Sequence, residues 1–352
     1  MQLYNVELFE PDFTYRDSAQ VEELNHSFDY LDIEKTKIKI PGTIKACKGD
    51  WIRIRNKKFE AVGIISDVKI KAKEVELEYK PASKIFNVKT YMDFSGLDDI
   101  TVELWLSNII RSLYIDNEDS LQNVKGLEIK VTSGQTGGTF SDYETGINNL
   151  FSVIIDAFTL YGIVCLFSMD VQRKKVILTI GTSIAEKFTI ESDLPTVLEK
   201  DITIKEAKES TNKLIVYNEA DYTESVVYYR DANDNITTVD TDRVSPVVFD
   251  STVVKVSNNK TFAEVALSKA QSTLKATQYD NLIEITTTYE DELVRPLERV
   301  IGQKADIISG TSVYSTVLTG MDFSNDSIKL IFGTIRLELT KQLKSRWRKE
   351  NV

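Results

Sequence analysis

The sequence predicts an α+β, multidomain protein with two β-barrel-like modules, separated by an α+β insertion domain and a helical excursion. Three observations predict this class. Short segments of alternating apolar and polar residues fill the first 85 residues and return near the end of the chain. Three segments between them repeat apolar residues at helical spacing. A stretch near the N-terminus also resembles one near the C-terminus.

Residues 1–85 predict the first β-barrel-like module, because short strands follow one another closely. Pro41-Gly42 marks a turn after the second strand, and Pro81 closes the last one. The strands are expected at residues 2–9, 36–40, 50–55, 59–70 and 74–79.

Residues 86–205 predict the α+β insertion domain. A first helix is expected over 98–114, opened by Asp98-Asp99, because acids suit a helix N-terminus. A second is expected over 143–161, capped by Thr139 or by Ser141 with Glu144 in a capping box. Strands are expected at 127–133, 162–170 and 174–181.

Residues 206–240 and 281–340 predict the second β-barrel-like module, with a hairpin turn at 231–235. A helical insertion is expected at 241–280. Its helix over 260–275 places four residues on one face, namely Phe262, Ala266, Ala270 and Leu274. Residues 341–352 form a basic tail.

Residues 49–79 and 302–332 align without a gap at an offset of 253 positions. Gly49 meets Gly302, Ile54 meets Ile307, and the apolar residues of the last predicted strand meet their counterparts. Few of the aligned residues are identical, so chance alternation of β-strands is the competing explanation. We expect a structural repeat, which means two related β modules in one chain.

The net charge of −11 is unevenly distributed. Residues 1–34 carry nine acidic residues against one arginine, whereas 35–84 carry fourteen lysines and arginines against six acids. The overall acidity argues against a dedicated nucleic-acid-binding protein, which must neutralise many phosphates. The basic stretch is typical of one face of a subunit contact or of a solvated face.

Cys47 and Cys165 are the only cysteines, and their strand-like, apolar surroundings predict two buried free thiols. The N-terminus has acids where a secretion signal needs basic and apolar residues. No run of 18 apolar residues is present, so no stable membrane insertion is expected. We expect synthesis in the cytosol.

The stretch 131–151, VTSGQTGGTFSDYETGINNLF, has the glycines of a phosphate-binding loop. However, Gly138 is followed by Thr139 and Phe140 rather than by the lysine that a P-loop requires. The glycine spacing also differs from the dinucleotide pattern. We interpret the stretch as a connection from a strand to a capped helix, with a mobile loop at a subunit contact or in a channel as the alternative.

Other signs of chemistry are weak. His26 is the only histidine, and no Gly-x-Ser-x-Gly motif accompanies it. Together with the two cysteines it is too scattered for a zinc site. Residues 231–242 are rich in Asp and Asn but lack the Gly and the final Glu of an EF-hand, which favours a polar hairpin. We therefore predict no enzyme, no catalytic residue, no cofactor and no metal ligand.

The run KGDWIRI at 48–54, followed by FEAVGIISDVKI at 59–70 and VELEY at 75–79, resembles the start of a phage tail hub. This family comprises the baseplate hub, or the N-terminal hub of the tail-associated lysin, of long-tailed phages, prophages and tail-like particles. In it, a strand beside a Gly-Asp pair precedes a Gly-Ile-Ile strand and an α+β insertion. The resemblance covers nearly the whole chain in element order.

The resemblance implies a homotrimer at the tail tip of a virion, made in the cytoplasm of a bacterial host. Two modules per subunit would form a pseudo-sixfold ring that joins the tail tube to the tip and lets DNA pass without specific binding. The implied partners are the distal tail protein, the tail tube, the tape-measure protein and a fibre or receptor-binding protein. Many members carry a C-terminal fibre or cell-wall hydrolase domain; this chain stops at Val352, soon after the second module, so no lytic activity is expected. Two alternatives remain: a tail-tip cell-wall (peptidoglycan) hydrolase and a host-surface glycan-binding protein.

Overall fold

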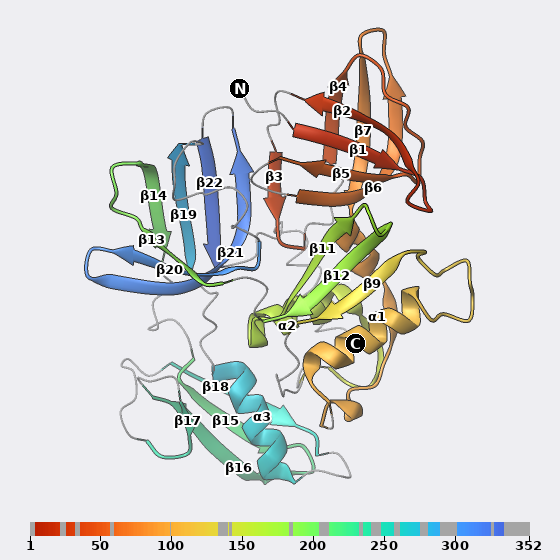
Figure 1. Cartoon of the computed structure of the whole chain (residues 1–352). Coiled ribbons are helices and arrows are strands. Elements are labelled where there is room, and N and C mark those ends of the chain that lie inside the picture. Colours follow the sequence, from red (N-terminus) through yellow and green to blue (C-terminus); the bar gives the residue numbers. More distant parts are fainter. Residues whose placement is uncertain are drawn as a thin grey trace.

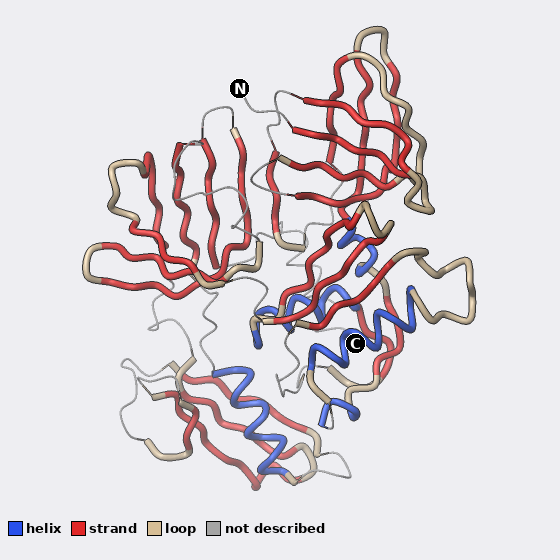
Figure 2. The backbone as a smooth tube through the Cα atoms, viewed as in Figure 1, coloured by secondary structure: helices blue, strands red, loops and turns tan. Residues whose placement is uncertain are grey.

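The computed structural model shows a protein built mainly from β-sheet, with three α-helices, in the part of the chain that it describes (Figures 1 and 2). Two β modules lie side by side, and two mixed units lie below them in the view of Figure 1. This confirms the predicted α+β class with two β modules. The described residues are 4–21, 26–31, 36–56, 60–98, 100–132, 140, 143–182, 186–203, 211–231, 235–240, 248–256, 261–274, 281–288, 301–324 and 327–333.

The first β module is a six-stranded antiparallel sheet in the order β2-β1-β5-β6-β7-β4. The edge strands β2 and β4 also contact each other, so the sheet curls toward a barrel. The apolar residues of the alternating pattern point into the curve, as Val75, Leu77 and Tyr79 of β7 show. The strands are β1 (Tyr4–Phe9), β2 (Tyr15–Val21), β4 (Thr36–Pro41), β5 (Trp51–Arg55), β6 (Glu60–Ile70) and β7 (Glu74–Pro81).

The second β module is a seven-stranded sheet in the order β13-β20-β21-β22-β19-β14, and β3 pairs with β21 beside this path. The buried apolar residues of both modules form one continuous cluster. The strands are β3 (His26–Asp29), β13 (Phe188–Glu191), β14 (Val197–Thr203), β19 (Leu282–Thr288), β20 (Lys304–Ser309), β21 (Ser312–Phe323) and β22 (Ser327–Gly333).

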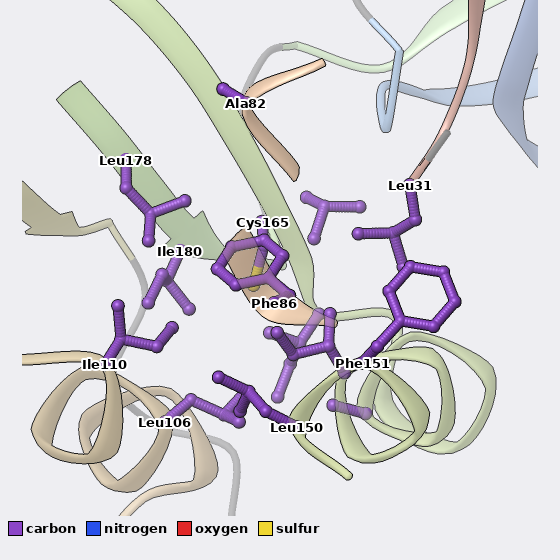
Figure 3. Close-up of a cluster of buried hydrophobic side chains, with 14 of the residues drawn as sticks. Leu31, Ala82, Phe86, Leu106, Ile110, Leu150, Phe151, Cys165, Leu178 and Ile180 are labelled. Atoms are coloured by element: carbon purple, nitrogen blue, oxygen red, sulfur yellow. The ribbon is translucent and has the colours of Figure 1, made fainter. Parts of the chain in front are cut away.

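An α+β domain lies under the first module, with helices α1 and α2 against the sheet β11-β12-β9 and a separate pair β8-β10. Figure 3 shows Leu106 and Ile110 of α1, with Leu150 of α2, in one apolar core with Leu178 and Ile180 of β12. The elements are η1 (Ala82–Phe86), β8 (Lys89–Met92), η2 (Ser95–Asp98), α1 (Val102–Tyr114), β9 (Leu127–Val131), β10 (Gly146–Asn149), α2 (Leu150–Tyr161), β11 (Val164–Asp170) and β12 (Lys175–Gly181).

The second helix begins later than the sequence predicts. Asn149 is its N-cap and accepts a hydrogen bond from the backbone N–H of Ser152 at 3.1 Å. Ile147, predicted on the buried helical face, instead lies in β10, opposite Tyr91 of β8. The predicted caps Thr139 and Ser141 lie outside the described residues, and a cap at either is wrong for this helix. Pairing with β8, which lies more than fifty residues earlier in the chain, overrides the local helical spacing.

Residues 206–240 do not join the second module as predicted. β15 (Lys213–Asn218), β16 (Asp221–Arg230) and β17 (Ile236–Thr237) pair with β18 (Phe249–Val254) in a separate sheet, β17-β16-β15-β18. β15 pairs with β18 in parallel, a contact that hairpin patterns in a sequence do not reveal. Conversely, β13 and β14, predicted in the insertion domain, belong to the sheet of the second module.

The predicted helix in this separate unit is α3 (Phe262–Leu274), which packs on β15 and β16. Ala266, Ala270 and Leu274 are buried against the sheet, as their spacing predicts, and Phe262 is half-buried beside them. Thr261 and Glu264 form a capping box, in which the Glu264 carboxylate accepts from the Thr261 N–H at 2.7 Å. The helix prediction is confirmed.

The predicted repeat is confirmed in strand order and register. β5-β6-β7 and β20-β21-β22 are both antiparallel meanders. Trp51 lies opposite Ile64, and the residues 253 positions later, Lys304 and Val317, also lie opposite each other. The segments therefore share one topology.

Both meanders also carry the same irregularity. The pairing of the second and third strands skips Ser66 in the first module and Thr319 in the second. The Ser66 hydroxyl lies 3.1 Å from the carbonyl oxygen of Glu78, and the Thr319 hydroxyl lies 3.2 Å from that of Ile331. A bulge and its side-chain bond at matching positions are not expected from chance alternation of apolar residues.

Each meander starts after a glycine with a positive φ, +94° at Gly49 and +91° at Gly302. Their N–H groups donate to the carbonyl oxygens of Ile65 at 2.9 Å and Leu318 at 2.7 Å, again matching positions. Only glycine adopts this backbone conformation without strain.

We predict that Gly302→Ala destabilises the protein more than Gly49→Ala. Both substitutions force alanine into a positive φ, at a cost of about 1 kcal/mol. At Gly302 the new Cβ would also lie 2.9 Å from the Val164 side chain, whereas nothing lies within 4 Å at Gly49. We expect about 1–3 kcal/mol more from this overlap. Urea unfolding measures both variants, and equal losses would contradict the difference in surroundings.

The two cysteines differ, although the sequence predicts both as buried. Cys47 is exposed, because it precedes the turn into β5 on the outside of the first module. Cys165 is buried in the core of the α+β domain (Figure 3). Burial raises the pKa of the Cys165 thiol to about 12.

We predict that a thiol-directed reagent labels one cysteine per folded chain, Cys47. The raised pKa keeps the Cys165 thiol protonated and unreactive well above pH 8, and the core excludes the reagent. Mass spectrometry should show one label on the native chain and two after denaturation. Rapid native labelling of the Cys47→Ser variant would contradict the burial of Cys165.

Candidate functional site

Two features of the described residues would indicate metal or membrane chemistry: a group that could bind a metal ion, and a helix that could span a membrane. No group of three or more His, Cys, Asp or Glu side chains among them is arranged to hold a metal ion. None of the described helices is long and apolar enough to cross a membrane. His26 contributes its backbone to β3. Residues 133–139, the glycine-rich part of the predicted loop, lie outside the described residues.

The Asp- and Asn-rich segment 231–242 is a polar hairpin where the structure describes it. β16 and β17 pair across it, with Arg230 opposite Ile236. Both carboxylate oxygens of Asp231 accept hydrogen bonds from Asn235, at 2.8 Å from its N–H and 3.0 Å from its amide. This carboxylate is therefore occupied in holding the turn.

One hollow of about 480 Å³ lies in the unit of α3, at the end of β15. Glu224 lines it and accepts a hydrogen bond from the Asn218 amide at 2.5 Å. Lys255 and Glu219 bring opposite charges to the same wall. These side chains stabilise one another and do not include a nucleophile beside a base.

The arrangement that bears most directly on function is the junction between the two β modules. β3 lies between β2 and β4 in the chain, yet it pairs antiparallel with β21, Asp29 opposite Gly320. The next residue, Tyr30, donates its N–H to the Thr319 carbonyl oxygen at 2.7 Å. The N-terminal part of the chain thereby supplies a strand to the sheet of the second module (Figure 1).

Tyr30 also fixes the junction to the α+β domain. Its ring packs on Phe158 of α2 at a centroid distance of 4.8 Å. Its hydroxyl accepts the N–H of Cys165 at 3.0 Å, and burial raises the pKa of this phenol well above its ordinary value. The following Leu31 is buried with φ at +58°, a strained conformation that tight packing maintains. Three parts of the protein therefore meet at these two residues.

Buried polar residues fix each meander to an earlier strand. Asp50 accepts the Cys47 N–H at 2.7 Å and lies 2.7 Å from Nε of Arg16 on β2. Its counterpart Gln303, 253 positions later, donates to the carbonyl oxygen of Glu186, just before β13, at 2.6 Å. The Gly-Asp pair of the sequence motif is thus structural, and the second module uses Gly-Gln for the same task.

The basic stretch 35–84 is partly neutralised within its own module. Lys71 bonds to Glu74 at 2.7 Å and to Glu76 at 3.2 Å. The hydrogen bond from Lys71 holds the pKa of each carboxylate below its ordinary value. Lys57 and Lys58 lie outside the described residues. A contact between this stretch and an acidic neighbour therefore remains a prediction.

The sequence does not reveal that β3 pairs with the sheet of the second module, nor that Tyr30 connects this sheet to the α+β domain. Residues 26–29 form a segment of four residues with one apolar side chain, Phe28, so their periodicity does not indicate which sheet they join. The internal repeat offers the one usable signal, because it predicts two sheets of the same kind that can accept equivalent strands.

No protein-family model matches the sequence, and no curated protein matches it. Solved structures do match. The prophage tail protein gp18 from Listeria monocytogenes EGD-e is 11% identical with a TM-score of 0.51, covering 99% of this chain and 100% of that one. The tail protein from Neisseria meningitidis MC58 is 11% identical with a TM-score of 0.50, covering 94% and 96%.

A third match is to the Francisella PdpA-VgrG complex, 12% identical with a TM-score of 0.52, covering 95% of this chain but 53% of that one. The three structures share their overall architecture with this chain. Their sequence identities of 11–12% are so low that the matches inform about the fold alone. The matches to the two tail proteins extend over almost the full length of both chains. The chain therefore has the fold of phage and prophage tail proteins.

Proposed function

We propose that this chain is a structural hub protein at the distal tip of a phage, prophage or tail-like-particle tail, and that it is not an enzyme. Three copies form a pseudo-sixfold ring that joins the tail tube to the tip. The observation that carries the proposal is the repeat of one meander, with the same register and bulge, at an offset of 253 residues.

The repeat matters because of symmetry. A threefold ring of single-module subunits offers three equivalent positions to a neighbour, whereas two like modules per subunit offer six. A head-to-tail contact between subunits closes into a ring when its rotation divides a full turn. Such a subunit suits a junction between parts of different rotational symmetry.

The proposed partners follow from this position. They are the tail tube, the distal tail protein, the tape-measure protein and a fibre or receptor-binding protein. DNA passes through the ring without specific binding: the chain is acidic overall, with a net charge of −11, and an acidic lumen would repel phosphates. The protein resides at the tail tip of the virion.

Native mass spectrometry and low-resolution imaging of the full chain test the ring. We expect a mass of three chains and a ring with six lobes, because each chain contributes two modules. A chain that stays monomeric up to high micromolar concentration would contradict the homotrimer. Clearing of cell walls by the isolated chain would instead support the hydrolase, and binding to purified wall glycans would support the glycan-binding protein.

We predict that reversing charges in the basic stretch weakens the ring. Substitution of Lys57, Lys58, Lys69 and Lys71 by Glu should increase the dissociation constant and make it less sensitive to salt, because attraction to an acidic neighbour is lost. A double reversal of the exposed Lys125 and Lys130 in the α+β domain is the control. Sedimentation at two salt concentrations measures both variants. An unchanged mass distribution would exclude this role for the stretch.

A further inference from the structure

The long central strand of the second module is covered along one edge by two different strands. β20 pairs with residues 312–317 of β21, and β3 pairs with residues 320–323. The other edge of residues 320–323 is occupied by β22, so β3 lies on the same edge as β20. Every part of β21 beyond the bulge therefore has a strand on both sides.

The matching strand of the first module, β6, has no second strand paired along this edge in the described part of the chain. β5 pairs with residues 60–64 of β6, and β7 pairs with residues 67–70 along the opposite edge. No strand in the described part of the chain pairs with residues 67–70 along the β5 edge. Ile70 is 76% exposed, whereas Phe323, the matching residue of β21, is 4% exposed.

In chain order, β3 corresponds to β14: each immediately precedes, among the strands of the two modules, the strand that pairs with the third strand of a meander. β3 is the last strand before β4, which pairs with the third strand of its meander, β7. β14 is the last strand of its own sheet before β19, which pairs with the matching strand β22. β14 forms the edge of the sheet and pairs with β19 alone among the described strands, and its Leu198 is 59% exposed.

We propose that β14 of one copy adds as an antiparallel strand to residues 67–70 of β6 in the next copy. This repeats between copies the contact that β3 makes with β21 inside each copy. The inference rests on the proposed ring and names the strands that close it.

The strand directions agree with this contact. β14 runs antiparallel to β19, which runs antiparallel to β22, which runs antiparallel to β21. β14 therefore opposes β21 in direction, as β3 does. The proposed contact requires a ring axis along the strands, because rotation about such an axis preserves strand direction. It also requires that β6 take the direction in its module that its counterpart β21 takes in the second; β14 of the neighbouring copy is then antiparallel to β6.

The chemistry of both edges suits strand addition. Main-chain N–H and C=O groups of two open edges satisfy one another, and the side chains on one face supply specificity. The exposed Ile70 and Leu198 provide apolar area to bury at such a contact. An exposed isoleucine on an open edge is otherwise a risk for aggregation.

Cysteine cross-linking of the full chain tests the pairing. In a Cys47→Ser background, Ile70→Cys is combined in turn with a cysteine at each of residues 198–201 of β14. Paired strands bring Cα atoms within disulfide distance, so at least one combination should give covalent dimers and trimers on mild oxidation. Ile147→Cys with the same β14 cysteines is the control, because Ile147 is 66% exposed on a different domain.

A second test does not depend on register. Ile70→Lys should raise the concentration at which the trimer dissociates about tenfold or more, because a charge replaces a buried apolar side chain at each contact. Ile147→Lys should leave this concentration unchanged. The exposure of Ile70 in the single chain means that the variant should fold with an unchanged melting temperature as a monomer.

The outcomes separate this inference from the proposed ring. A native trimer with no cross-link above the control, and with unchanged dissociation in Ile70→Lys, overturns the strand pairing while the ring stands. A monomer at every concentration, without cross-links, overturns both. Cross-linked trimers together with weakened Ile70→Lys assembly support the pairing.

Discussion

The structure depends on how the backbone groups along one long strand, β21, find hydrogen-bond partners on both edges. β6 and β21 are each longer than the first strand of their meander, and each bends at a bulge beyond it. In β21 the remaining edge is filled by β3, a strand from the other end of the chain. This one pairing joins the two modules, because it commits N-terminal backbone to a C-terminal sheet.

The other parts of the protein are arranged around that joint. Tyr30 follows β3 and carries the contact into the α+β domain, through Phe158 and the N–H of Cys165. The unit of α3 lies between β14 and β19 in the chain and has its own small core. The α+β domain shares its core with the first module, because Phe9, Trp51 and Val62 belong to the same buried cluster as the residues of α1 and α2.

Sequence patterns predicted the parts that depend on local spacing. The stripe of Ala266, Ala270 and Leu274 is buried on α3, and the meander at 302–332 follows its counterpart strand for strand. Predictions that needed long-range pairing failed more often. The helix α2 starts later than predicted because β10 pairs with β8. Residues 213–237 lie outside the second module, contrary to the prediction, because β15 pairs with β18. Cys47 is exposed, although the sequence predicts it to be buried. The prediction failed because apolar neighbours in the sequence do not determine which side chains near a turn face the solvent.

The sequence by itself determined the two meanders, the helices and the need for a glycine before each meander, because alternation, helical spacing and a positive φ act over a few residues. The tertiary structure alone decided which sheet receives each edge strand. A strand of four residues, such as β3, has backbone donors and acceptors that any open edge can satisfy. The sheet with which β3 pairs is therefore determined by which strand edge lies unpaired beside it in the folded protein.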